Sequence, residues 1–111
     1  MISRIWHGWT TLENAEAYES LLKNEIFPDI QNRRLAGYRG IHLLRRNLSH
    51  KVEFITIMWF DSIEAIRAYA GVNYERAIIA PKARALLAQF DGRAQHYEVP
   101  AEMWAEAANM A

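Results

Sequence analysis

Residues 52–60 read VEFITIMWF, and this stretch decides the fold. A run this rich in Ile, Phe and Trp predicts a β-strand, whose alternate side chains point to opposite faces of a sheet. One face receives Phe54, Thr56, Met58 and Phe60, and the other receives Ile55, Ile57 and Trp59. Because both sets are apolar, both faces of the sheet must be covered from water.

Three further strands are predicted around this one. Turn-forming residues at 47–51 join it to a preceding strand at 38–46, so the two strands form a hairpin. A stretch rich in Ile and Trp at 2–9 predicts the first strand, and residues 94–99 predict the last.

Apolar residues spaced three and four apart predict a long helix between the first two strands. Thr10 and Glu13 match a capping box, so this helix should begin near Thr11. Pro28 cannot continue the hydrogen-bond ladder, and the helix should either kink there or resume as a short second piece through Ile30.

The segment after the hairpin predicts a broken helix. Asp61 or Ser62 can cap its first part, which Gly71 ends by tolerating a left-handed backbone conformation. A short helical turn is expected at 74–78. A further helix is expected over 81–90, with proline as its first residue and apolar residues at helical spacing.

The order strand, helix, strand, strand, broken helix, strand is that of a ferredoxin-like α+β domain, βαββαβ, with an antiparallel sheet and helices on one face. We expect this domain to span residues 1–99 and a helical tail to follow at 100–111. The chain has no further element for the second sheet face, so a second copy packing sheet against sheet is the economical cover. The alternative is that the tail folds back over this face.

Composition limits the partners and the compartment. Thirteen basic side chains balance thirteen acidic ones, so the chain lacks the positive field that attracts nucleic acid or anionic lipid. There is no cysteine, which excludes disulfides and thiolate metal sites. No apolar run approaches the roughly 20 residues of a membrane span, and the first residues do not resemble a signal peptide. We therefore expect a cytoplasmic protein that binds neither nucleic acid nor membrane.

Six segments resemble the antibiotic biosynthesis monooxygenase domain family, and together they cover nearly the whole chain up to residue 99. They are IWHG (5–8), GYRG (37–40), EF (53–54), DSIEAIRAYAG (61–71), ARALL (83–87) and HYEV (96–99). The resemblance implies a dimeric α/β barrel in which each subunit holds a pocket between sheet and helices. It implies no single chemistry, because members of the superfamily oxidise aromatic polyketides without a cofactor, degrade heme, isomerise small acids or have no assigned activity.

Cofactor-free oxygenation is the activity that the resemblance favours. It requires no bound cofactor, because the substrate itself reduces oxygen after losing a proton. The protein then supplies a base, an apolar pocket poor in water, and hydrogen-bond donors. Strand parity and the resemblance together predict the base as His42 or His96 and the pocket lining as Trp6, Trp59, Phe60 and Tyr69.

Each of these residues also has a structural interpretation. A tryptophan on a strand commonly packs in the core, and a strand histidine is commonly a hydrogen-bonded or half-exposed neighbour. His96 could hold the first and last strands together. The rival function is therefore a non-catalytic small-molecule-binding or stress-associated homodimer, whose cavity is part of the core.

Heme degradation is a third alternative, and the sequence argues against it. The heme-degrading members carry an asparagine on the first strand, a tryptophan at the end of the third strand and a histidine iron ligand in the second helical region. The corresponding positions here hold Trp6, Phe60 and Ala77 or Ile78. No nearby helical residue therefore offers an imidazole to iron.

Overall fold

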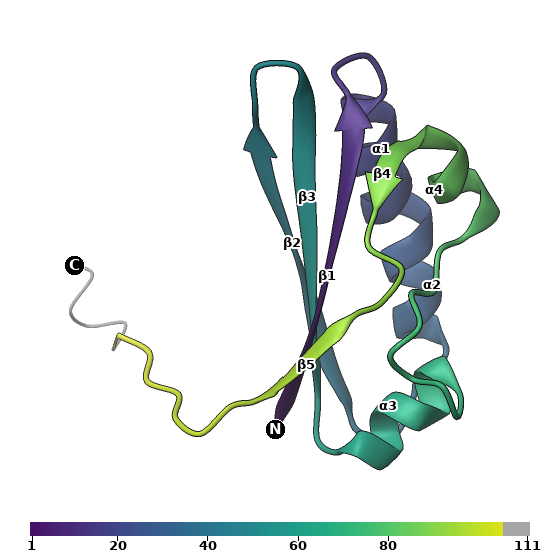
Figure 1. The fold of residues 1–111 in the computed structure, drawn as a ribbon. Helices are drawn as coiled ribbons and strands as arrows, with labels where there is room; N and C mark the ends of the chain where they lie inside the picture. The colour runs from purple at the N-terminus through teal and green to yellow at the C-terminus, as the bar shows by residue number, and fades with distance from the viewer. Residues whose placement is uncertain (106–111) are drawn as a thin grey trace.

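Long antiparallel strands form the centre of the computed structural model, which describes residues 1–105 (Figure 1). β1 (Ile2–Thr11) pairs along its whole length with β3 (Lys51–Phe60), and β2 (Tyr38–Asn47) pairs with the far edge of β3. The other edge of β1 receives two short strands, β4 (Leu87–Phe90) and β5 (Gln95–Glu98). The sheet order β2-β3-β1-β4, with β5 beside β4 on β1, confirms the predicted ferredoxin-like α+β fold.

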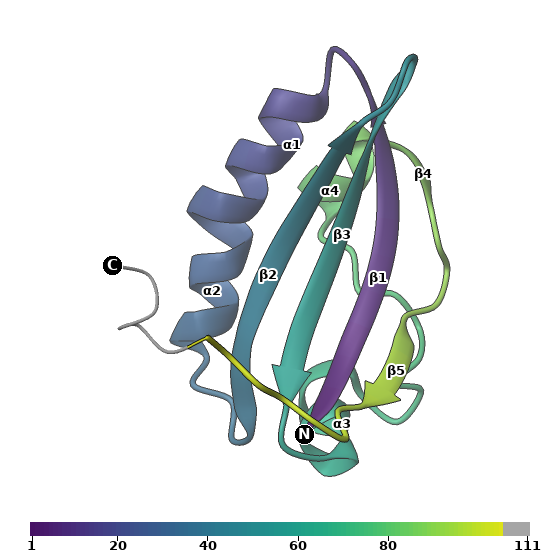
Figure 2. The same ribbon diagram turned by 90° about the vertical axis from the view of Figure 1, so that its left-hand side faces the viewer.

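All helices cover one face of this sheet (Figures 1 and 2). The first is continuous and consists of α1 (Ala15–Leu21), a π-helical turn η1 (Leu22–Ile26) and α2 (Phe27–Asn32). The π-turn lets the Phe27 amide bond back to Leu22, so that Pro28 enters the first turn of α2, where its missing N–H is harmless. The helix therefore runs past Pro28 to Asn32 without a break, and the π-turn takes the place of the predicted interruption.

The second helical region contains α3 (Ile63–Ala70) and α4 (Pro81–Leu86). The Ser62 hydroxyl accepts a hydrogen bond from the Ala65 amide at 3.2 Å, which confirms one of the two predicted caps. Gly71 ends α3 with φ of 88°, a conformation that favours glycine, and its amide bonds to Arg67 at 2.7 Å.

The core lies between the sheet and these helices. From β3, Phe54 and Phe60 are fully buried and Met58 is nearly so. They pack against Tyr18 of the long helix and Ile66 of α3. Full burial of such a side chain contributes about 1.5–3 kcal/mol, so the helix-facing half of β3 holds the layers together.

The start of the long helix differs from the prediction. β1 continues through Thr10 to Thr11, which pairs with Lys51, so Thr10 belongs to the sheet and cannot cap a helix. Asn14 occupies the cap position, and its amide bonds to the Thr11 hydroxyl at 3.2 Å. The predicted capping box of Thr10 and Glu13 is wrong, because Thr10 is a strand residue that pairs with Val52 and therefore does not precede the first turn of the helix.

Two helical predictions in the second half are also wrong. The expected turn at 74–78 is an irregular segment, because its amide at Ala77 bonds to the Gly92 carbonyl at 2.9 Å. The expected helix over 81–90 ends at Leu86, and residues 87–90 become β4. An apolar spacing of three and four fits both states over so few residues, and pairing with β1 decides between them.

No helix of residues 1–105 lies over the second sheet face (Figure 2). This face presents Ser3, Ile5, His7, Trp9, His42, Leu44, Ile55, Ile57, Trp59 and Tyr97, with Arg46, Lys51, Glu53 and Gln95 toward its margins, and we call it the open face. Ile5, Ile55, Ile57 and Trp59 remain half-buried through contact with one another along the sheet. The prediction that β3 is apolar on both faces is therefore confirmed.

Residues 99–105 have no regular secondary structure, and the rest of the predicted helical tail, residues 106–111, lies outside the described residues. The described part runs away from the body on the side of the open face (Figure 1). No helix within residues 1–105 is long and apolar enough to cross a membrane.

Candidate functional site

A groove of about 640 Å³ opens on the helix side, between the long helix and residues 78–82. We call it the outer groove. It adjoins a small interior space of about 60 Å³, the inner pocket, which reaches the sheet. Six residues border both spaces and form the wall between them: Ile26, Ile30, Tyr69, Ile78, Ile79 and Ala80.

The inner pocket has an apolar and aromatic lining. The sheet contributes Trp6, Ile41, Thr56 and Met58, and α1, η1, α2 and α4 contribute Tyr18, Leu22, Ile26, Phe27, Ile30 and Ala83. Its polar groups are the hydroxyls of Tyr18, Thr56 and Tyr69 and the indole N–H of Trp6. Among the described lining residues, none carries a carboxylate, an imidazole or a basic group.

Trp6 is fixed by its neighbours on the adjoining strand edge. Its indole nitrogen donates to the carbonyl oxygen of Asp91 at 2.7 Å, and its ring lies 6.4 Å from that of Phe90. A Cβ at Gly8 would come within 2.9 Å of both Trp6 and Leu87. The sequence Trp6-His7-Gly8 thus makes room for the indole ring on the pocket side of β1.

Two phenols face this region in their neutral form. Burial raises the pKa of Tyr18 far above its ordinary value, so its hydroxyl is a hydrogen-bond donor at neutral pH. Tyr18 is only 1% exposed, so its hydroxyl lies in the interior beside the inner pocket. Burial also raises the pKa of Tyr69, against an opposing effect of Arg4 and Arg33. Both phenols can therefore donate to a ligand.

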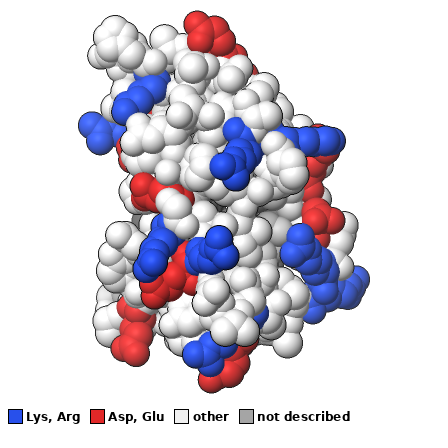
Figure 3. Space-filling view, turned by 45° about the vertical axis from the view of Figure 1, so that its right-hand side comes forward, with Lys and Arg blue, Asp and Glu red and all other residues white. Residues whose placement is uncertain are grey.

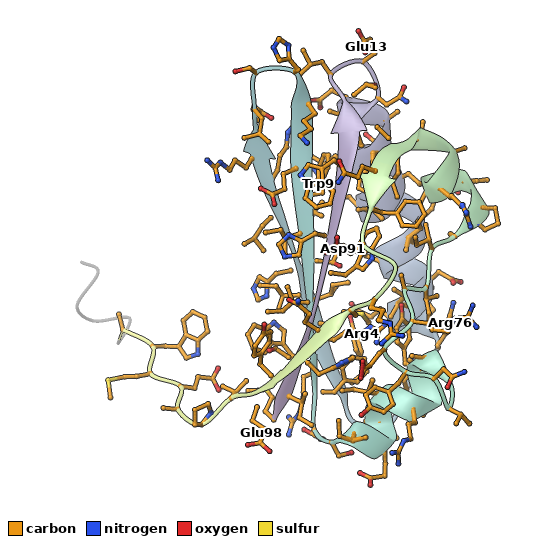
Figure 4. The ribbon with its side chains drawn as sticks, viewed as in Figure 1. Arg4, Trp9, Glu13, Arg76, Asp91 and Glu98 are labelled. Carbon is orange, nitrogen blue, oxygen red and sulfur yellow. The ribbon has the colours of Figure 1, made fainter. Side chains whose placement is uncertain are left out.

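Arg4 lies beside the pocket and is 4% exposed. Its guanidinium donates to the carbonyl oxygens of Tyr74 and Arg76, the latter at 2.9 Å, and sits 5.7 Å from the centre of the Tyr69 ring. Figure 4 shows Arg4 reaching from β1 toward the segment that carries Arg76. Within residues 1–105 it forms no ion pair with a carboxylate, so carbonyl groups hold this buried cation.

His96 completes this arrangement from β5. Its Nε2 atom lies 3.0 Å from the Arg4 guanidinium, and its ring packs edge-on against Tyr74. Because a guanidinium has only donors, Nε2 must accept, which places the proton of the neutral imidazole on Nδ1. Burial, and then the charge of Arg4, lower the pKa of His96, against a smaller raising effect of Glu75.

The lowered pKa of His96 predicts a pH-dependent stability. Between pH 6.5 and the lower folded-state pKa, the unfolded chain binds the proton more readily than the folded chain. The free energy of unfolding should therefore fall as pH drops through this window. Urea unfolding at several pH values checks this, and the loss should be smaller in His96→Gln, whose amide oxygen can still accept from Arg4. Equal pH slopes in the two proteins would contradict the assignment.

Four of the six predicted site residues lie on the helix side of the sheet. Trp6 and Tyr69 border the inner pocket. Phe60 is fully buried behind Tyr69, with ring centres 5.9 Å apart, and does not border the pocket. His96 lies on the same side of the sheet, one contact away through Arg4.

His42 and Trp59 lie on the open face, separated from the other four residues by the sheet. The Trp59 indole nitrogen donates to His42 Nδ1 at 2.9 Å, and the rings meet edge-on. The structure therefore gathers Trp6, Tyr69 and His96 on one side and His42 with Trp59 on the other. The catalytic and binding roles of these residues stay predictions.

Sequence reasoning missed Arg4, the Tyr18 hydroxyl and the wall at 78–80. A signal existed for Arg4, because it shares strand parity with Trp6 and so points toward the helices. Helical spacing points the Tyr18 side chain toward the core, but it does not show that the hydroxyl reaches a pocket. The wall depends on the 77–92 backbone contact, which no local pattern specifies.

Charges around the outer groove cancel in pairs. Lys82 bonds to Glu25 at 3.1 Å, and Arg33 bonds to Asp29 at 3.3 Å. Basic and acidic side chains are interspersed over this side of the molecule (Figure 3). No group of three or more His, Asp or Glu side chains among the described residues is placed to hold a metal ion.

Comparison with known proteins supports the fold. No family model matches the sequence, and no curated protein matches it either. Among solved structures, the chain is similar to a Bacillus cereus protein described as a candidate antibiotic biosynthesis monooxygenase. The TM-score is 0.67, the sequence identity is 13%, and the match covers 96% of this chain and 97% of the other. At this identity the likeness concerns the fold alone.

Proposed function

We propose that this chain binds a neutral aromatic or other apolar small molecule in the inner pocket, as one half of a homodimer. The observation that carries the proposal is the composition of the lining. Apolar and aromatic side chains surround a few hydroxyl donors, and no described lining residue carries a carboxylate, an imidazole or a basic group. Such a site favours a ligand that is largely apolar and carries a hydrogen-bond acceptor, such as a carbonyl oxygen.

The electrostatics favour a neutral ligand. A carboxylate or phosphate entering the pocket would lose its hydration without meeting a cation, which is costly in an apolar site. The rim offers no compensation, because its cations at Arg33 and Lys82 are already paired with acidic partners. Arg4 is near, but its guanidinium is occupied by backbone carbonyls and His96.

The ligand gains room by displacing the wall. The inner pocket of about 60 Å³ holds only a few atoms, whereas the adjoining groove is about 640 Å³. Typical small-molecule sites measure roughly 300–1,000 Å³. Residues 77–80 belong to no helix or strand, so moving Ile78 and Ile79 breaks no ladder of backbone hydrogen bonds. Their movement would join the two spaces.

A pair of alanines on α4 allows a matched test of the site. Ala83 borders the inner pocket, whereas Ala85 is exposed on the same helix. Wild-type protein should bind aromatic ketones in isothermal titration more tightly than their parent hydrocarbons. Ala83→Leu fills the pocket and should weaken ketone binding at least about tenfold, which is a loss of about 1.4 kcal/mol. Ala85→Leu should bind like wild type.

Two outcomes of this titration would reject the site. One is unchanged affinity in a folded Ala83→Leu protein, verified by circular dichroism. The other is preferential binding of carboxylates over neutral ketones. Ala83→Leu could also destabilise the core by overpacking. The relative affinities of the wild-type protein for ketones, hydrocarbons and carboxylates therefore test the site without any substitution.

The open face supports the homodimer. By strand register, its centre is a row of His42, Ile57 and Ile5, and the next row holds Leu44, Ile55 and His7. Four of these six side chains are aliphatic, and adjoining aliphatic side chains on an uncovered sheet face are characteristic of an interaction surface. Two copies related by a twofold axis would bury it against itself. The absence of cysteine accords with a cytoplasmic location, which belongs to the same proposal.

Cofactor-free monooxygenation is the second candidate, favoured by the likeness to the Bacillus cereus protein. In that reaction a substrate CH₂ group and O₂ give a carbonyl group and water, and the substrate supplies all four electrons. On the pocket side His96 is the predicted base, and its Nε2 would have to leave Arg4 to take a substrate proton, whereas His42 would act only from the open face. Oxygen uptake with anthrones and hydroquinones tests the activity. Rates retained in both His42→Ala and His96→Ala would exclude these two roles.

A further inference from the structure

The chain leaves its body after β5 as an extended segment, residues 100–105, which we call the C-terminal arm. The Val99 amide donates to the Met1 carbonyl at 2.9 Å and fixes the point of departure at the start of β1. From there the arm projects on the side of the open face, away from the helices (Figure 1).

The arm carries two large apolar side chains that the rest of the described residues leaves uncovered. Met103 is 96% exposed and Trp104 is 76% exposed. Isolated apolar residues on a surface are ordinary, but these two are adjacent and stand on a segment that extends instead of folding back. An aromatic ring offers roughly 150–250 Å² for burial, which makes tryptophan an effective anchor in protein contacts.

A hydrogen bond within the arm and a proline at its start both lower the free-energy cost of such a contact. The Trp104 indole nitrogen donates to the Glu102 carboxylate at 2.7 Å, so the ring can be buried without leaving an unpaired donor. Pro100 restricts the backbone at the start of the arm, which lowers the entropy lost when the arm is held in one place.

We propose that the C-terminal arm docks on a second copy of this chain, with Met103 and Trp104 as its anchors. The inference rests on the proposed homodimer through the open face. The arm projects on the side where that second copy lies, and its own body offers it no contact at these two residues. In a twofold-symmetric dimer the contact occurs twice, because the arm of each copy packs on the body of the other.

The ring of Trp104 reports directly on this contact. Protein labelled with 5-fluorotryptophan gives four fluorine resonances, one for each tryptophan, and Trp104→Phe assigns the fourth. In a sample that sedimentation shows to be dimeric, the Trp104 resonance should be protected from a soluble paramagnetic agent. Trp104→Ala should raise the dimer dissociation constant at least about tenfold. Val72→Ala, at an 88% exposed position outside the arm, should leave it unchanged.

The possible results distinguish failure of the arm contact from failure of the proposed homodimer. A dimeric sample with Trp104 open to the agent, and with the Trp104→Ala constant unchanged, would overturn the arm contact and leave the homodimer standing. A monomeric sample would overturn both. Protection of Trp104 that persists in monomers would place the arm on its own chain and also overturn the proposal.

Discussion

Ile57→Asp is expected to convert the homodimer into folded monomers. Ile57 lies at the centre of the open face, opposite Ile5 on β1 and His42 on β2. In a twofold interface, the substitution places two carboxylates in apolar surroundings close to the axis. Burying an unpaired charge costs several kcal/mol, so the dissociation constant should rise by at least about a thousandfold, or about 4 kcal/mol. Sedimentation velocity over a range of concentrations measures this change.

The matched control is Val72→Asp, which puts the same charge on an exposed apolar residue that lies outside the sheet. Its sedimentation should match that of wild type. Ile57 is only half-buried within one copy, so the Ile57→Asp monomer should retain its circular dichroism spectrum. A folded Ile57→Asp protein that still forms dimers with wild-type affinity would show that the open face is not the interface.

Arg4→Met is expected to give the largest loss of folding stability among single substitutions outside the apolar core. The change removes the donors that satisfy Tyr74, Arg76 and His96, while it keeps most of the side-chain volume. Unpaired buried acceptors cost about 1–3 kcal/mol each, partly relieved by relaxation, so we expect a loss of about 3 kcal/mol. Urea unfolding followed by circular dichroism measures the loss.

Arg93→Ala provides the control for this change. Its side chain is 81% exposed and its nitrogen is 3.8 Å from Glu75, so its removal should cost less than about 0.5 kcal/mol. Arg4→Lys should recover only part of the loss, because a lysine has one nitrogen to replace a fork of donors. If Arg4→Met were as stable as wild type, the hydrogen bonds of Arg4 would not hold the segment at 74–76 in place.

The sequence predicts the layers well because β3 carries a strong pattern. Its alternation places Phe54 and Phe60 toward the helices and Ile57 toward the open face, and the structure follows it. Local spacing fails where a segment is short and its partner is distant. Residues 87–90 fit a helix by spacing, but pairing with Gly8 and its neighbours makes them a strand.

The candidate site is less predictable than the fold. The predicted pocket lining contains both Trp59 and Phe60, but adjacent strand residues point to opposite faces, and the structure separates these two accordingly. Parity also places Arg4 beside Trp6, so this cation could have been found from sequence. The Tyr18 hydroxyl and the wall of Ile78 and Ile79 depend on tertiary contacts, which a single sequence does not specify.

Sedimentation equilibrium of the wild-type chain at micromolar concentration tests the central claim most directly. A sheet that is apolar on both faces, with helices on only one, predicts a particle of about twice the chain mass of 12.9 kDa. A single species at the chain mass over the whole concentration range would contradict the account, because the open face would then be stable in water without a second copy.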